Sequence, residues 1–172
     1  MRNIVLIGFM GSGKSTVGRR LARSLGWTLV DSDDYIVEHE GCAITDIFRD
    51  KGEAYFRNLE TTCLKEILAK YPEKLILACG GGVPIAEENR KLLRKIGTVF
   101  YLRAKPGTLE NRLKGDTSRP LLAGGDLRNR IDTLLKQRGK IYLDAADIII
   151  DTDDKQLGDV INEITKKGRQ PM

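Results

Sequence analysis

Eight residues near the N-terminus have the types and the spacing of a phosphate-binding loop. Residues 8–15 read Gly-Phe-Met-Gly-Ser-Gly-Lys-Ser, which fits the pattern G-x-x-x-x-G-K-S. Glycines let the backbone curl so that successive N–H groups point at a phosphate chain, and a helix that starts there adds partial positive charge. Lys14 supplies a cation for the outer phosphates, and the hydroxyl of Ser15 can hold a magnesium ion. The loop therefore predicts a site for the phosphates of a nucleotide.

The residues on both sides of the loop support this interpretation. Ile4-Val5-Leu6-Ile7 is a continuous apolar run, as in a strand that is buried on both faces. After the loop, Val17, Leu21 and Leu25 recur every fourth residue, as on one face of a helix. The alternative is a glycine-rich turn that binds nothing, which the order strand, loop, helix disfavours.

Two carboxylates follow the second apolar stretch, Trp27–Val30. Asp31 and Asp33 come where this strand should end, and ligands bind at the carboxyl edge of an open α/β sheet. Residues i and i+2 that leave a strand can project the same way. We expect one carboxylate to steady a magnesium ion and the other to orient or deprotonate an attacking hydroxyl. Capping of the next helix is the alternative, and it is sufficient for Asp34.

Two further motifs are each ambiguous when taken alone. Arg57 and Glu60 have the i, i+3 spacing of a common surface ion pair, but Arg57 could instead grip a substrate carboxylate with Glu60 holding it. The triplet Gly80-Gly81-Gly82 follows a third apolar strand, where glycines let a ligand approach the backbone closely. A plain turn before Pro84 is the alternative for the triplet.

Two arginines come later in the chain. Arg119 lies in a polar, glycine-containing segment, residues 114–125, which is long enough for a mobile lid. An arginine that closes over phosphates can stabilise the charge of the transition state. Arg138 lies on the amphipathic helix that follows. Isolated arginines are usually solvated, so neither stands out without the other motifs.

The hydrophobic pattern predicts an α/β fold, a doubly wound parallel sheet of the P-loop NTPase type with helices on both faces. A long helical segment, residues 35–71, is interrupted at Gly41 and Gly52, and Thr45 is a candidate helix cap. The order of the strands in the sheet stays open. Strands are expected at Asn3–Ile7, Trp27–Val30, Leu75–Cys79, Thr98–Leu102 and Asp147–Ile150.

Length and composition fit one globular domain without a disulfide framework. The chain has 172 residues, of which 41% are hydrophobic and 31% charged. The three cysteines lie far apart and there is one histidine, so neither disulfides nor a zinc site is expected. No apolar run reaches the length of a membrane span, and because the first strand begins close to the N-terminus we expect no signal or transit peptide. These features favour the cytoplasm.

The charge balance favours anionic partners. The net charge is +5 and the pI is near 9.1. Nucleic acid is the obvious rival to small phosphorylated ligands. However, no run of five Lys or Arg residues occurs, and the aromatic residues, 6% of the chain, do not interleave with a basic stripe. We expect neither a nucleic acid nor a membrane as partner.

Together, these motifs resemble the shikimate kinase family over nearly the whole chain. The phosphate loop alone is shared with thousands of nucleotide-binding proteins, but the combination is far more specific. The matching motifs are the phosphate loop, D-S-D at 31–33, F-R-x-x-E at 56–60, G-G-G at 80–82, R-P-L-L at 119–122 and the region of Arg138.

The resemblance implies a fold like that of the nucleoside monophosphate kinases and a single kinase domain. The core would comprise residues 1–32, 61–111 and 126–172, with a substrate-binding helical insertion at about 33–60 and a lid at about 112–125. As implied by the family, ATP with Mg2+ would phosphorylate the 3-hydroxyl of shikimate, on the pathway to chorismate and the aromatic amino acids. The protein would act as a monomer.

The resemblance also implies a role for individual residues. Lys14, Asp33 and Arg119 would be catalytic, and Ser15 and Asp31 would hold the magnesium ion. Shikimate would be bound by Asp33, Arg57, Gly80, Gly81, Gly82 and Arg138. ATP would be bound by Gly11, Ser12, Gly13, Lys14, Ser15, Thr16, Arg112, Arg119 and Lys155.

The sequence differs from the family pattern at two positions, and it leaves two alternative functions open. Cys79 stands where the family often has Ser or Thr. Lys140 stands where the family often has Pro, so the family pattern does not predict the backbone conformation around Arg138. The chain could instead be a kinase for another small anionic alcohol such as gluconate, or a catalytically silent nucleotide-binding homologue. The silent homologue is disfavoured because the chain retains Lys14, Asp31, Asp33 and Arg119.

Overall fold

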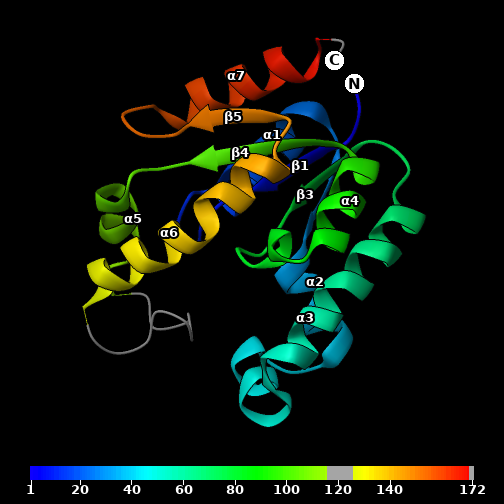
Figure 1. Cartoon of the computed structure of the whole chain (residues 1–172). Coiled ribbons are helices and arrows are strands. Elements are labelled where there is room, and N and C mark those ends of the chain that lie inside the picture. The colour runs from blue at the N-terminus through cyan, green and yellow to red at the C-terminus, as the bar shows by residue number, and fades with distance from the viewer. Residues whose placement is uncertain (116–125, 171–172) are drawn as a thin grey trace.

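A parallel five-stranded sheet forms the centre of the structure, a computed structural model that describes residues 1–115 and 126–170 (Figure 1). The strands follow the order β2-β3-β1-β4-β5, and all neighbours are parallel. The predicted fold class is confirmed, and the order that the sequence left open places β3 between β2 and β1. The strands are β1 (Ile4–Ile7), β2 (Thr28–Asp31), β3 (Leu75–Ala78), β4 (Thr98–Arg103) and β5 (Ile148–Asp151).

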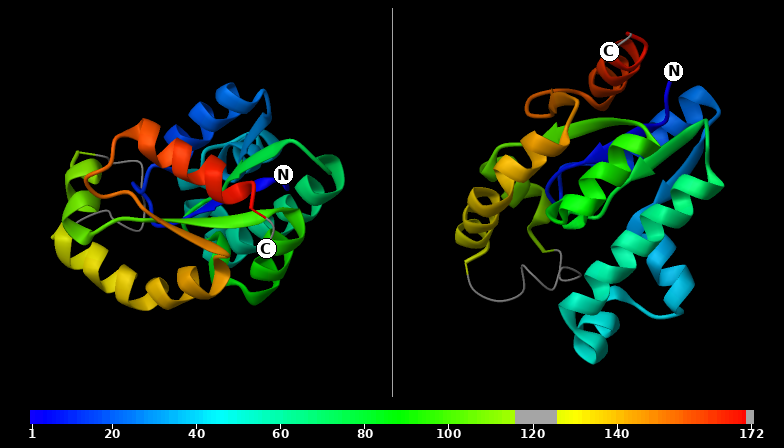
Figure 2. Two further views of the ribbon diagram at one scale, coloured as in Figure 1. Left: turned by 90° about the horizontal axis from the view of Figure 1, so that it is seen from above. Right: turned by 45° about the vertical axis from the view of Figure 1, so that its right-hand side comes forward.

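Helices cover both faces of this sheet and give it three layers (Figures 1 and 2). Val5 and Ile7 point to one face, and Ile4 and Leu6 point to the other, and all four are fully buried. This double burial explains the continuous apolar run of the first strand. One face packs on α3 (Ile44–Lys70), α4 (Glu87–Ile96) and α6 (Leu127–Ala145), and the other on α1 (Lys14–Leu25) and α7 (Leu157–Gly168).

Helix α2 (Ser32–Glu40) and helix α3 form the predicted long helical segment with its two interruptions. Gly41 ends α2 with a φ of 68°, and Gly52 breaks the helical geometry of α3 with a φ of 81° and a ψ of 172°. Both are left-handed or otherwise non-helical conformations that glycine adopts at low cost. In Figure 2, right panel, α2 and the N-terminal part of α3 extend away from the sheet.

The predicted cap at Thr45 is wrong. Helix α3 begins at Ile44 with Ala43 as its N-cap, and no side chain caps it. Thr45 therefore lies inside the first turn, where its hydroxyl does not occupy the capping position. Helix α3 also continues past residue 60, so the proposed end of the insertion falls within one helix, and that boundary stays a prediction.

The remaining elements connect the sheet to the C-terminal helices. Pro84 lies in a short 3-10 turn, Val83–Ile85, and α5 (Pro106–Leu113) begins at a proline. Arg119 and most of the predicted lid lie outside the described residues. Within residues 1–115 and 126–170, no helix combines the length and the apolar character needed to cross a lipid bilayer.

Asn3 ties the start of β1 to the connection between α3 and β3. Its side chain is almost completely buried, and the residue is 4% exposed. The Nδ2 group donates to the carbonyl of Tyr71 over 3.1 Å, and Oδ1 accepts from the N–H of Leu75 over 3.0 Å. One amide thus satisfies two backbone groups of a distant segment.

We expect Asn3→Ala to lower the free energy of unfolding by about 2–3 kcal/mol, because it removes the partners of both backbone groups in a buried place. Urea unfolding measures this change. Asn162→Ala, on the exposed side of α7, is the matched control and should change stability by less than about 0.5 kcal/mol. Equal effects of the two substitutions would show that the bridge of Asn3 contributes nothing.

Candidate active site

The carboxyl ends of three strands lie level at one edge of the sheet. Ala78 of β3 pairs with Leu6 of β1 on one side and with Asp31 of β2 on the other. The segments that follow these strands therefore meet, and a cavity of about 890 Å³ lies between them. The predicted site residues that line this cavity are Gly11, Ser12, Gly13, Lys14, Ser15, Thr16, Asp31, Asp33, Gly80, Gly81, Arg112 and Lys155.

The phosphate loop has the backbone geometry that its glycines permit. Gly13 caps α1 with a φ of 97°, a left-handed conformation that a side chain would strain. The Nζ of Lys14 donates to the carbonyls of Gly8 and Phe9 over 3.0 and 2.9 Å. The loop thus holds its own cation against its backbone, next to the first N–H groups of α1, so positive charge gathers where phosphates would approach.

Asp31 joins the phosphate loop to helix α2. Its Oδ2 accepts from the hydroxyl of Ser15 over 2.8 Å, and its Oδ1 accepts from the N–H of Asp33 over 3.0 Å and so caps α2. Capping and site formation are therefore one arrangement rather than alternatives. Asp31 and Asp33 do not project together as alternate residues of an extended strand, as the sequence predicted. Helix α2 begins at Ser32, so Asp33 lies on its first turn.

The glycine triplet makes room for the side chains of the site. A Cβ at Gly80 would lie 3.1 Å from Cγ of Asp33, and one at Gly82 would lie 2.7 Å from Cζ of Arg57. None of the three glycines has a positive φ, so conformational freedom is not what requires them. Glycine is needed at positions 80 and 82 because a carboxylate and a guanidinium pack directly against the backbone there. Close approach of a ligand stays a prediction.

Arg57 is held by two carboxylates on its own helix. Its Nη1 donates to Glu60 over 2.8 Å, and its Nη2 donates to Glu53 over the same distance. The Glu60 side chain is only 1% exposed, so the interpretation as a solvated surface pair is wrong. Glu53 was not among the predicted residues, although its i, i+4 spacing to Arg57 is a signal in the sequence.

The Arg57–Glu60 pair belongs to a buried charged cluster beside the cavity. Arg138 is 7% exposed, and its Nη1 has no hydrogen-bond partner among the described residues. Burial raises the pKa of Glu60 to about 7, although the Arg57 guanidinium beside it acts in the opposite direction. Arg57, Gly82 and Arg138 do not line the cavity itself. A cluster with two guanidinium groups and one buried carboxylate can receive a further anion.

The remaining predicted residues approach the cavity from the C-terminal half. Arg112 on α5 donates from Nη1 to the carbonyl of Gly11 over 3.3 Å. Lys155 precedes α7 and forms an ion pair with Glu163 over 2.6 Å. Arg119 lies outside the described residues, so its position relative to the cavity stays a prediction.

The raised pKa of Glu60 predicts a pH dependence of stability. A folded pKa of about 7 exceeds the ordinary value of 4.5, so the stabilising contribution is complete below 4.5 and is lost as the pH rises toward 7. We expect the difference in free energy of unfolding between the wild type and Glu60→Gln to fall by roughly 1–3 kcal/mol from pH 5 to pH 8. Urea unfolding at both pH values measures it.

Glu53→Gln is the control for this experiment. It removes a carboxylate from the same arginine, but the Glu53 side chain is 54% exposed and stays hydrated in the folded state. Its effect on stability reports the loss of the exposed ion pair with Arg57 alone. A pH-independent difference for Glu60→Gln would contradict the effect of burial.

Comparisons with known sequences agree with this arrangement. A sequence model of the family described as shikimate kinase matches residues 10–168. A shikimate kinase of Persephonella marina is 46% identical over 164 residues, which cover 95% of this chain and 97% of that protein. A shikimate kinase of Geobacter metallireducens is 44% identical and covers 96% of this chain and 90% of that protein.

Solved structures give the same result. A structure of shikimate kinase from Acinetobacter baumannii in complex with shikimate matches with a TM-score of 0.92 and 36% identity, over 97% of this chain and 92% of that one. The shikimate kinase from Aquifex aeolicus vf5 matches with a TM-score of 0.79 and 37% identity, over 96% and 94% of the two chains. Sequence, fold and site together show that this chain belongs to the shikimate kinase family.

Proposed function

We propose that this protein transfers the γ-phosphoryl group of ATP to the 3-hydroxyl of shikimate and gives shikimate 3-phosphate and ADP. Membership of the family supports the reaction as a whole. The observation that carries the proposal in this chain is the shared sheet edge, where a phosphate loop, a carboxylate and two residues of the Gly80–Gly82 segment, here called the glycine corner, line one cavity. An arginine pair, the buried Arg138 and the half-buried Arg57, adjoins it.

The phosphate loop, residues 8–15, is proposed to bind the triphosphate of ATP. Lys14 would neutralise charge on the outer phosphates, and the loop N–H groups would hold the oxygens. Arg112 and Lys155, which line the same cavity, are proposed to lie near the adenine.

Ser15 and Asp31 are proposed to hold Mg2+. Their hydroxyl and carboxylate are 2.8 Å apart at the cavity, and both offer the oxygen ligands that Mg2+ prefers. Among the described residues no group of three or more His, Cys, Asp or Glu could form a metal cage. This fits Mg2+, which is usually held by one or two protein groups together with phosphates and water. The ion would supply charge neutralisation for the transferred phosphoryl group.

Asp33 is proposed to bind and deprotonate the acceptor hydroxyl. It lines the same cavity as Lys14 and packs against Gly80. A carboxylate in this place can accept the proton as the hydroxyl oxygen attacks the phosphorus.

Arg57 and Arg138 are proposed to bind the carboxylate of shikimate, with the Gly80–Gly82 backbone beside it. Among the described residues, the buried Nη1 of Arg138 has no hydrogen-bond partner, which supports binding of an anion here. A guanidinium pair suits a small carboxylated alcohol better than a nucleotide base.

Other parts of the proposal rest on the family pattern alone. Arg119 would reach the phosphates from a lid at about residues 112–125, and the insertion at about 33–60 would carry the acceptor site. We propose a monomer in the cytoplasm without nucleic-acid or membrane partners. The three free cysteines, Cys42, Cys63 and Cys79, fit a reducing compartment.

The direct test is incubation with ATP, Mg2+ and shikimate, with ADP release read by a coupled assay. Turnover well above the ATPase background is expected, and gluconate and other sugar acids run in parallel should give none. Turnover with gluconate but not shikimate would assign the chain to another kinase. ATP binding without any turnover would identify a silent homologue.

We expect Asp33→Asn to lower kcat at least about 100-fold, because it removes the base but keeps the size of the side chain. The Kd for ATP should change less than twofold, as measured by calorimetry. Asp34→Asn is the matched control, since Asp34 also lines the cavity and should leave kcat close to the wild type. A parallel loss of ATP affinity would contradict the role given to Asp33.

We expect Arg57→Ala to raise KM for shikimate about 10–100-fold, because a charge-assisted hydrogen bond to the carboxylate is lost. KM for ATP should change less than threefold. Arg57→Lys keeps the charge but not the planar fork, and should give an intermediate KM. Arg49→Ala, which removes an exposed arginine from the same helix, is the control. Equal damage to both KM values would make Arg57 a structural residue.

A further inference from the structure

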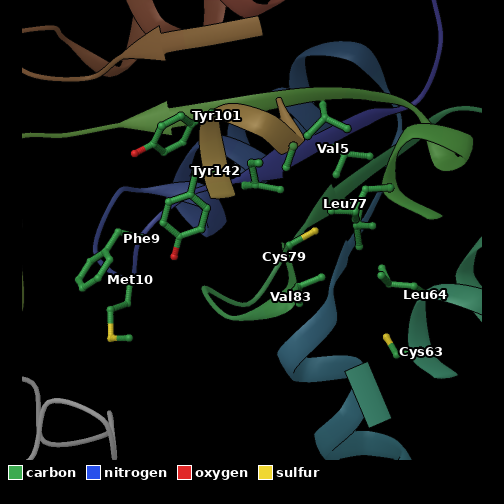
Figure 3. Packing of buried hydrophobic residues seen from close by; sticks show 14 of the residues in the cluster. Val5, Phe9, Met10, Cys63, Leu64, Leu77, Cys79, Val83, Tyr101 and Tyr142 are labelled. Atoms are coloured by element: carbon green, nitrogen blue, oxygen red, sulfur yellow. The ribbon is translucent and has the colours of Figure 1, made fainter. Parts of the chain in front are cut away.

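Tyr142 is a buried polar residue to which the proposed reaction gives no role. It is fully buried on α6, four residues after Arg138, and so lies one helical turn further along the same helix. Its hydroxyl donates to the carbonyl oxygen of Gly81 over 2.6 Å. Figure 3 shows the hydroxyl end of Tyr142 directed toward the loop between Cys79 and Val83.

The carbonyl that Tyr142 holds belongs to a segment without side chains. Gly80, Gly81 and Gly82 cannot be fixed by packing of their own side chains, so their place depends on backbone contacts. The N–H of Gly80 donates to the hydroxyl of Ser32 over 2.8 Å, and the carbonyl of Gly81 accepts from Tyr142. These two long-range anchors come from α2 and α6, and the N–H groups of Val83 and Ile85 hold the carbonyls of Gly80 and Gly82 locally.

Both ends of this anchored segment contact the groups that would bind the acceptor. Asp33 packs against Gly80, and Arg57 packs against Gly82. A shift of the Gly81 peptide would therefore move the backbone against which the proposed base and the proposed carboxylate ligand rest. Tyr142 and Arg138 share one helix, so the same element places an arginine of the cluster and the anchor of the corner.

The ring of Tyr142 has a second, separable contribution. It packs against Tyr101 of β4 with the ring centroids 5.2 Å apart. Burial raises the pKa of Tyr142 to about 12, so its hydroxyl stays a neutral donor at every pH at which the enzyme would work. Phenylalanine would keep the ring contact and remove only the hydroxyl, together with its interaction with the neighbouring Arg138 guanidinium.

We propose that Tyr142 is a positioning residue for the acceptor substrate: its hydroxyl fixes the Gly81 peptide and thereby the shikimate side of the site. This inference rests on the proposed function. It adds to that function a residue that contacts neither substrate in the proposed scheme.

The test compares Tyr142→Phe with Tyr101→Phe. The second variant removes the same atom from the other ring of the pair, and no hydrogen bond of that hydroxyl is seen in the described structure. For Tyr142→Phe we expect KM and the calorimetric Kd for shikimate to rise about 5–10-fold, the change expected for one hydrogen bond. KM for ATP should change less than twofold, and kcat, which depends on the Asp33 base beside Gly80, should fall by a smaller factor than the affinity for shikimate. Tyr101→Phe should leave all four values within twofold of the wild type.

Three results would overturn the proposal: no change in shikimate affinity for Tyr142→Phe, an equal loss of ATP and shikimate affinity, or the same loss in Tyr101→Phe. If Tyr142→Phe does not fold, Ser32→Ala removes the other anchor of the corner and should raise the Kd for shikimate selectively, and an unchanged Kd would refute the role of the anchors. Failure of the proposed function itself is distinguishable, because the wild type would then neither bind nor phosphorylate shikimate.

Discussion

The level ends of β1, β2 and β3 are the constraint on which the site depends. Because Ala78 is in register with both Leu6 and Asp31, the chain leaves all three strands at the same edge of the sheet. The phosphate loop, the cap of α2 and the glycine corner then have to share one space. A register shift of one residue in any of these strands would also turn its side chains to the opposite face, so the double burial of the sheet keeps the site aligned.

Within that space, the absence of side chains matters as much as their presence. The backbone at Gly80 and Gly82 is close enough to Asp33 and Arg57 that no larger residue fits without displacing them. Glu60, buried and with a raised pKa, holds Arg57 from the other side. Burying a carboxylate is costly unless it is paired, so the cluster is stable only as a unit with its guanidinium groups. This interdependence makes the acceptor side of the site a single preorganised structure.

Local sequence signals predicted much of this protein. The phosphate loop, the apolar strands and the interruptions at Gly41 and Gly52 are short-range features, set by backbone sterics and by the spacing of apolar residues. Errors arose where a local rule competed with tertiary context. Helix α3 began before Thr45, and α2 began before Asp33, because helix ends are weakly specified by propensity alone.

The sequence by itself determined the chemistry available: a phosphate loop, two acids after the second strand, a glycine triplet and arginines at fixed positions. The tertiary structure decided which of these groups meet. Hydrophobic periodicity predicts that a strand is buried on both faces but not which strand lies beside it. The place of β3 between β1 and β2 could therefore not be predicted. The contact between Tyr142 and Gly81 joins residues 61 positions apart, and the buried Glu60 lies within electrostatic reach of Arg138 on α6. Such long-range contacts produce no repeating pattern in a single sequence, because they depend on how whole helices and strands pack.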